Sequence, residues 1–170
     1  MVVEKILHRR FDKKEPEWDF MKFYKIVKYW GKMKYDLSTA DLELLFFLYS
    51  EMPFSKADFK TFTQVFPFDV SRFERLLRDK WIVKWRNRTA TEGALYVLAY
   101  KGNQAVTTIY KKLTGDIISE DRRENKLFKK TGLTYSNKTH RNALIEMNNE
   151  YRKRNSKMVN GRPKNIPYND

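Results

Sequence analysis

Residues 69–101 constrain the fold of this chain more than any other stretch, and they read DVSRFERLLRDKWIVKWRNRTATEGALYVLAYK. The apolar residues at its start recur at helical spacing, which predicts a short amphipathic helix over about 70–79. Four apolar side chains of that helix should face the core: Val70, Phe73, Leu76 and Leu77. β-Branched and aromatic runs at 81–85 and 95–99 predict two strands. A helix should therefore lead straight into a β-hairpin.

Basic and polar side chains mark the other faces of this unit. Arg72 and Arg75 stand three residues apart, which predicts that both lie on one exposed face of the helix. Arginine is the commonest specific partner of guanine in the major groove, because its fork matches two acceptors. In isolation, the same pattern is equally typical of an ordinary solvated helix face. The loop at 86–94 is too long for a tight hairpin, and its Arg, Asn and Thr side chains suit phosphates or the minor groove.

A helix that enters a groove, with a hairpin beside it, is the arrangement of a winged helix. We therefore predict duplex-DNA binding, with the helix at about 70–79 in the major groove and the wing at 86–94 on the minor groove or backbone. The candidate DNA-binding residues are Ser71, Arg72, Arg75, Arg78, Lys84, Arg86, Arg88, Arg152 and Arg154.

The charge of the chain agrees with a polyanionic partner. The 170 residues include 35 Lys and Arg against 21 Asp and Glu, a formal net charge of +14. Such a surplus favours nucleic acid or an anionic membrane surface, although a merely basic soluble protein would look the same. No apolar run approaches the ~20 residues of a spanning helix. The charged N-terminus lacks a signal-peptide core. We expect a cytoplasmic, nucleoid-associated protein without membrane contact.

Enzymatic activity is not expected from these residues. The chain has no cysteine, which excludes disulfides, thiolate metal sites and cysteine nucleophiles. His8 and His140 lie in charged segments without a paired metal-ligand spacing. There is no glycine-rich phosphate loop, and carboxylate pairs such as Asp121 with Glu124 lie among basic residues, as in salt-bridged surface. We expect no catalytic site, no metal and no cofactor.

The remaining segments are mostly helical, so the predicted fold class is mainly α with a small β-hairpin. One helix covers about 17–31, ends at Gly31, and carries a broad aromatic stripe that packs either within its own domain or against a second subunit. A buried helix starts at Ser38 or Thr39, with Asp41 in its first turn, and ends at Pro53. Further helices are predicted from Ser55, from Lys101 to Gly115, over the charged segment 119–128, and over 136–154.

These elements divide the chain into four parts: an N-terminal arm at 1–16, a winged-helix domain at 17–115, a helical extension at 116–154 and a basic tail at 155–170. The extension has a narrow apolar seam and is a candidate for dimerisation. The tail contains Asn160-Gly161 and two prolines, which predicts irregular backbone. A like-charged tail of this kind usually orders only when a polyanion neutralises it.

Taken together, residues of about 17–114 resemble the MarR family of winged-helix DNA-binding proteins. The resemblance lies in LSTADLELLFFL at 37–48, in SRFERLLRDKWIVKWR at 71–86, and in LAYKGNQ at 98–104, which is similar to the family's step from wing to next helix. Trp81 stands where the family commonly has glycine, and the family's Asp-x-Arg wing motif is represented by Arg88 alone. The resemblance implies a two-fold dimer that places one recognition helix in each half-site. It assigns no effector pocket.

Two functions follow from these patterns. The first is a dimeric DNA-binding transcription regulator with an unspecified effector. The alternative is a structural or assembly protein, virion-associated or nucleoid-like, that uses the same fold and a basic tail for non-specific nucleic-acid or protein contacts.

Overall fold

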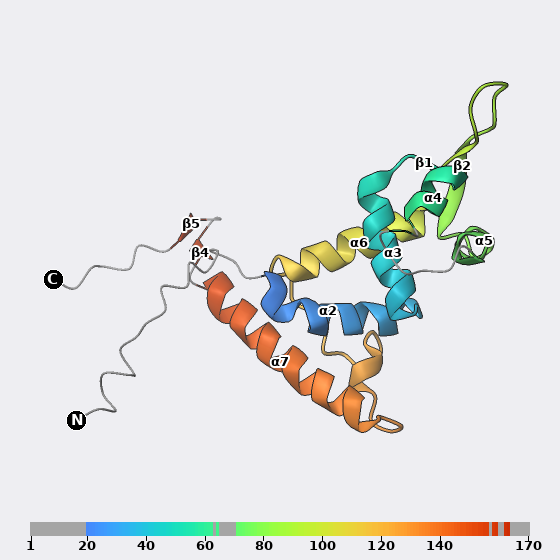
Figure 1. Cartoon of the computed structure of the whole chain (residues 1–170). Coiled ribbons are helices and arrows are strands. Elements are labelled where there is room, and N and C mark those ends of the chain that lie inside the picture. Colours follow the sequence, from blue (N-terminus) through green and yellow to red (C-terminus); the bar gives the residue numbers. More distant parts are fainter. Residues whose placement is uncertain (1–19, 63, 65–70, 157, 160–161, 164–170) are drawn as a thin grey trace, which may run out of the picture.

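The computed structural model describes residues 20–62, 64, 71–156, 158–159 and 162–163, which form a mainly helical protein with a small three-stranded antiparallel sheet (Figure 1). In chain order the elements are α2 (Phe20–Tyr35), α3 (Thr39–Glu51), β1 (Phe54–Ser55), α4 (Lys56–Phe62), α5 (Ser71–Arg78), β2 (Ile82–Arg86), β3 (Leu95–Leu98), α6 (Tyr100–Leu113), a 3₁₀ turn (Lys126–Phe128), α7 (Tyr135–Ser156), β4 (Met158–Val159) and β5 (Arg162–Pro163).

Helix α3 is the centre of the core, as its almost continuous apolar run predicts. Its buried side chains include Leu42, Leu44, Leu45 and Leu48, all at most 1% exposed. The helix starts where Ser38 accepts a hydrogen bond from the backbone N–H of Asp41, at 3.0 Å, which confirms Ser38 as the N-cap. Helices α2 and α6 pack against α3, and α7 covers α2 from the other side (Figure 1).

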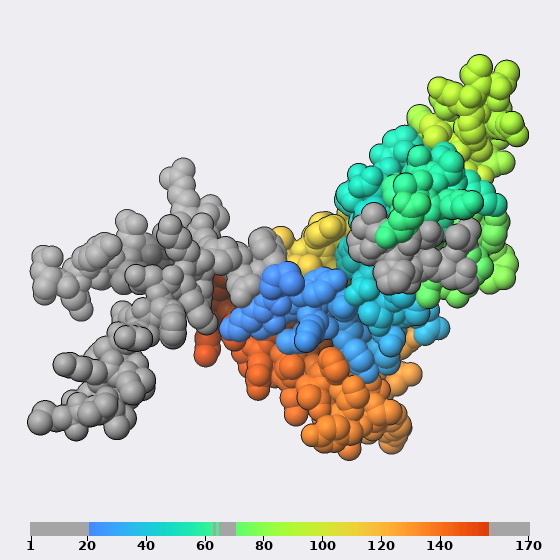
Figure 2. Space-filling view, viewed as in Figure 1, coloured from blue at the N-terminus to red at the C-terminus, as the bar shows by residue number. Residues whose placement is uncertain are grey.

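The sheet has the order β1-β3-β2. The two predicted strands form the hairpin, and β1 adds a third strand of two residues that sequence periodicity did not indicate. The pairing of β2 with β3 is interrupted by a β-bulge, because Lys84 lies opposite Tyr96 whereas Arg86 lies opposite Leu95. The loop beyond the bulge stands clear of the body, as Figure 2 shows.

The connection from α5 to β2 is tight. The N–H of Trp81 donates to the carbonyl of Leu76 at 2.8 Å, and the N–H of Lys80 donates to the carbonyl of Leu77 at 3.1 Å. This pair of bonds is a Schellman motif, which needs a left-handed residue between helix and strand. Lys80 takes that conformation with φ of 57°. The position at which glycine is usual is therefore Lys80, one residue before Trp81.

Two sequence predictions about helices are wrong. Helix α2 continues through Gly31 to Tyr35, because Gly31 is buried at the crossing with α6, where an added Cβ would lie 2.7 Å from Cδ1 of Ile109. The segment 119–128 is not a helix; within it, only Lys126–Phe128 form a 3₁₀ turn. The start of α2 at residue 17 and the packing of Val70 lie outside the described residues.

Helix α7 lies where the sequence predicts, and its apolar seam is covered within the chain. Leu144, Met147 and Tyr151 are fully buried, and the Tyr151 ring meets the Phe23 ring of α2 edge-on, with centroids 5.5 Å apart. The buried Asn148 side chain accepts from the N–H and donates to the carbonyl of Ile118, fixing the preceding linker. Strands β4 and β5 follow as an antiparallel pair, so these residues of the tail are not irregular as predicted, and Asn160-Gly161 lies outside the described residues. No helix in the described ranges is long and apolar enough to cross a membrane.

Candidate nucleic-acid interface

Helix α5 presents one face to the core and one to solvent. Phe73 and Leu76 are each 1% exposed and pack inward, where the Phe73 ring meets those of Phe59 and Tyr96. The opposite face carries Ser71, Glu74 and Arg78, all exposed, and the side chain of Arg78 is 73% exposed. Of the residues predicted to contact DNA, Ser71 and Arg78 therefore lie on the outer face.

Arg72 and Arg75 lie at the edge of α5 that faces α3. The Arg72 guanidinium donates to Oδ1 of Asp41 at 2.7 Å, and the Arg75 guanidinium donates to the same oxygen at 2.5 Å. The second oxygen, Oδ2, accepts from the Ser38 hydroxyl at 2.5 Å. The side chain of Arg72 is only 23% exposed, that of Arg75 44%, and that of Asp41 10%. The predicted exposed arginine pair is thus a link between the first turn of α3 and α5.

The electrostatics of this cluster keep Asp41 ionised. Burial alone would raise the pKa of the Asp41 carboxyl, because it disfavours the charged form. Hydrogen bonds from Ser38 and Arg75, together with the charges of both arginines, outweigh that effect and lower the pKa below its ordinary value. Arg72 and Arg75 consequently face a permanent counter-charge at neutral pH.

The β-bulge separates two basic residues that a regular strand would place together. Residues paired across an antiparallel sheet share a face, and neighbours along a strand point to opposite faces. Lys84 therefore shares the inward face of Tyr96, the side of α5, whereas Arg86 shares the outward face of Leu95. Arg86 forms an ion pair with Glu92 across the loop. Among the predicted wing residues, Lys84 and Arg88 are the exposed ones.

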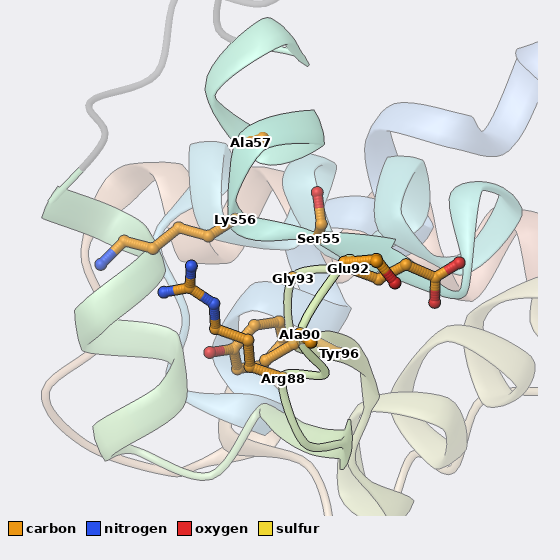
Figure 3. Close-up of a pocket in the computed structure, with 10 residues that line it drawn as sticks. Ser55, Lys56, Ala57, Arg88, Ala90, Glu92, Gly93 and Tyr96 are labelled. Carbon is orange, nitrogen blue, oxygen red and sulfur yellow. The ribbon is translucent and has the colours of Figure 1, made fainter.

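A pocket of about 440 Å³ lies between the start of α4 and the hairpin loop, and Figure 3 shows its lining. Arg88 and Lys56 line it from the loop and from α4, and in Figure 3 their charged ends lie on the same side as the Tyr96 hydroxyl. Glu92 points the opposite way. The Lys56 ammonium also forms an ion pair with Glu74 on α5.

Sequence reasoning did not single out Lys56 or Tyr96. Lys56 follows the capping residue of a short helix, and Tyr96 reads as an ordinary strand aromatic. The capping box Ser55-Lys56-Ala57-Asp58 predicts this helix from the sequence, but it gives no sign that Lys56 lines a pocket. Asp58 accepts from the N–H of Ser55 at 2.8 Å and Ser55 accepts from the N–H of Asp58 at 3.1 Å, which fixes where α4 begins.

The structure places the two remaining candidates, Arg152 and Arg154, on α7, away from α5 (Figure 1). The Arg152 guanidinium donates to Glu120 at 2.7 Å and to Asn149 at 2.9 Å. Arg154 lies near Gly115, at the end of α6. They are therefore not part of the surface made by α4, α5 and the hairpin. Among the described residues, no group of three or more His, Cys, Asp or Glu is placed to hold a metal ion.

Comparisons with protein-family models, with curated proteins and with solved structures gave no match to this chain. The resemblance to the MarR family stays a prediction that rests on the residues quoted for it.

Proposed function

We propose that this protein binds duplex DNA as a winged-helix protein and acts as a transcription regulator. The observation that carries the proposal is the element order α3, β1, α4, α5, β2, β3 with a sheet of order β1-β3-β2. In that order, a winged helix uses α5 as its recognition helix and the loop between β2 and β3 as its wing. Exposed cations of this chain lie on those two elements, and the net charge is +14.

The contacts of each basic residue suggest its role. Ser71 and Arg78 on the outer face of α5 would enter the major groove, and Arg75, half-exposed at its edge, would reach the adjoining bases or phosphates. Arg72 is mostly covered by its bond to Asp41, so its main role would be to orient α5. Lys84 and Arg88 would hold the wing to the minor groove or backbone.

Selection of bound duplexes from a random DNA pool at two salt concentrations tests this proposal. We expect enrichment of a defined sequence, and a palindromic consensus if the protein binds as a dimer. Replacing Arg78 or Arg75 by alanine should relax the preference at particular positions, because each hydrogen-bonded base pair that the arginine reads contributes about 1–3 kcal/mol of discrimination. Replacing Arg152, which lies on α7, is the matched control and should leave the consensus unchanged. An unenriched pool at both salt concentrations would contradict sequence-specific regulation.

The alternative, a structural or assembly protein, is favoured by one feature of the hairpin. Val83 is 39% and Trp85 61% exposed, so the hairpin carries apolar surface in addition to its cations. Exposed apolar surface of this kind suits association with another protein. This function would be favoured by DNA binding without sequence preference, together with a protein partner that dissociates when Trp85 is replaced by serine.

A further inference from the structure

The pocket between α4 and the hairpin loop brings together donors from three elements. We propose that Lys56, Arg88 and Tyr96 hold one phosphodiester of the DNA backbone in this pocket, so that α4 and the wing grip the same strand. The inference rests on the proposed duplex binding, and adds to it a specific phosphate site with two residues that the sequence did not indicate.

The donors of the pocket match a phosphate. Lys56 offers an ammonium, Arg88 a planar guanidinium and Tyr96 a hydroxyl, and the three lie on one side of the pocket in Figure 3. Arginine binds two phosphate oxygens through its fork, whereas lysine acts as a point charge. Within the described residues, no carboxylate pairs with Arg88, and the carboxylate of Glu92 is turned away towards Arg86. The local charge therefore favours an anion.

The ring of Tyr96, which lines the pocket, is held in place by packing against other aromatic rings. The residue is 9% exposed, and its ring meets the Phe73 ring edge-on at 4.9 Å and stacks with the Phe54 ring at 6.5 Å. Both phenylalanines are themselves 1% exposed. A hydroxyl fixed in this way needs no ordering when a ligand binds, which favours affinity.

The pocket has room for its ligand because the residues around the donors are small. Ala57, Ala90, Gly93 and Ala94 line it, and nothing lies within 4 Å of the position of a Cβ added to Gly93. A cavity of about 440 Å³ exceeds a bare phosphate and suits a sugar-phosphate unit. The pocket therefore has room for a nucleic-acid backbone, and the comparison of dTpT with inorganic phosphate below separates the two kinds of ligand.

The one obstacle is Glu74, which pairs with Lys56. Both side chains are well exposed, at 59% for Lys56 and 60% for Glu74, and ion pairs in solvent contribute little to stability. A phosphate held at the same time by Arg88 and Tyr96 would therefore displace Glu74 from Lys56. We expect Glu74 to weaken DNA binding in the natural protein, so Glu74→Gln should raise the affinity about twofold to fivefold at low salt.

Fluorescence anisotropy of a labelled duplex, measured over a range of salt with the full chain, tests the site. Lys56→Gln and Arg88→Gln should each lower the affinity about fivefold to tenfold and reduce the salt slope by about one, as removing one phosphate interaction does. The double variant should lose less affinity than the product of the single losses, because both residues hold the same phosphate. Tyr96→Phe, which keeps the buried ring, should weaken binding without changing the slope.

A double variant that removes two exposed charges elsewhere, Lys111→Gln with Lys138→Gln, is the matched control. It should leave affinity and salt slope close to those of the natural protein. If Lys56→Gln and Arg88→Gln behave like this control while the natural protein binds DNA, the pocket proposal is wrong and the duplex-binding proposal stands. Independent losses that lower the slope by two would assign the residues to separate phosphates and also overturn the shared site.

A second measurement keeps the pocket testable without duplex binding. The dinucleotide dTpT carries one phosphodiester, and titrating it should shift the amide NMR signals of Ala90 and Gly93 in the natural protein and not in Lys56→Gln/Arg88→Gln. Shifts with dTpT but no binding of duplexes would retain the pocket and reject the proposed function. Inorganic phosphate binding as tightly as dTpT would instead identify a small-anion site and overturn the backbone assignment.

Discussion

At the scale of single residues, the carboxylate of Asp41 joins α5 to α3. One oxygen accepts from two arginines of α5 and the other accepts from the residue that caps α3. Removing one partner of a largely buried ion pair leaves the other charge without compensation, which is more costly than losing a surface pair. Asp41 should therefore matter both for stability and for the position of the proposed recognition helix.

We predict that Asp41→Asn lowers the free energy of unfolding by about 2 kcal/mol at pH 7, because two arginines lose their counter-charge. The folded-state pKa of Asp41 is lowered below the ordinary value of 3.8, so its stabilisation is complete above pH 3.8 and is lost as pH falls through the folded pKa. The difference between the variant and the natural protein should therefore shrink in strong acid. Urea unfolding of both proteins at a series of pH values measures this difference in the free energy of unfolding.

Asp36→Asn is the control for that substitution. Asp36 lies just before α3, its side chain is 94% exposed, and it pairs with the ammonium of Lys126 at 3.7 Å. Asparagine tolerates the positive φ of 57° at this position as aspartate does. The change should alter stability by less than about 0.5 kcal/mol. Equal losses for the two variants would contradict the role assigned to Asp41.

The sequence predicts where Asp41, Arg72 and Arg75 lie on their helices, but not that they bind one another. The spacing of Arg72 and Arg75 correctly predicts that they share a side of one helix, and Asp41 is correctly placed in a first helical turn. Periodicity describes one element at a time, whereas the bond between them joins positions 31 and 34 residues apart. Nothing in the spacing of charges tells whether an arginine faces solvent or a carboxylate on another helix.

At the scale of elements, the close approach of α6 to the α5–β2 connection depends on Gly102. A Cβ added there would lie 2.8 Å from the backbone carbonyl oxygen of Trp81, and that carbonyl already accepts from the N–H of Ala99 at 2.9 Å. A backbone atom held by a hydrogen bond cannot move aside as a side chain can. The glycine of the Lys101-Gly102 step is thus required by packing between elements.

We predict that Gly102→Ala lowers the free energy of unfolding by about 1–3 kcal/mol, the usual cost of overpacking. In an open helix the same change would stabilise by about 1 kcal/mol, so the sign of the effect is diagnostic. Gly93→Ala, where nothing lies within 4 Å, is the control and should be nearly neutral. Thermal unfolding followed by circular dichroism would measure both, and a stabilised Gly102→Ala variant would refute the close approach.

The elements themselves were more predictable than their ends. Helices α3, α5, α6 and α7 and both hairpin strands occur where hydrophobic spacing and capping residues place them. The helix end predicted at Gly31 is wrong because a single sequence does not distinguish a glycine that ends a helix from one that lets two helices pack closely. Strand β1 is not predicted because two residues are too few to show alternation of apolar and polar side chains. Only its pairing with β3 identifies it as a strand.

At the scale of the whole molecule, the charge of +14 comes from several regions. The hairpin, α4 and α5 supply one basic region, whereas Arg152 on α7 is paired with Glu120. The tail from residue 157 adds further basic side chains beyond α7. If the protein binds DNA as proposed, the first region should set sequence preference and the tail should add affinity without preference.

We predict that ending the chain after Ser156, the last residue of α7, weakens DNA binding and lowers the salt slope by about 0.9 for each phosphate that the tail neutralises. The selected consensus should stay the same, because binding to phosphates carries no base information. Sequence selection and salt titration on both chains provide the measurement. Complete loss of binding on truncation would favour the structural alternative, since the tail would then be the main nucleic-acid-binding segment.

The proposed dimer is also a property of the whole molecule. The apolar seam of α7 packs on α2 and on the linker before it, so that seam is not open to a second copy. Dimerisation therefore stays a prediction, and sedimentation at several concentrations would test it. A two-fold dimer would have to use other surface of α2, α6 or α7 than the seam.

The bulge at Trp85 changes which face of the sheet the following side chains of β2 point to. Before it, even-numbered positions of β2 face α5; after it, Arg86 faces the other way. If Trp85 were instead paired opposite Leu95, the strand would alternate regularly and Arg86 would lie on the same face as Lys84. The pairing register at one residue therefore decides whether β2 presents Lys84 and Arg86 on one face or one on each face, without any change in the sequence.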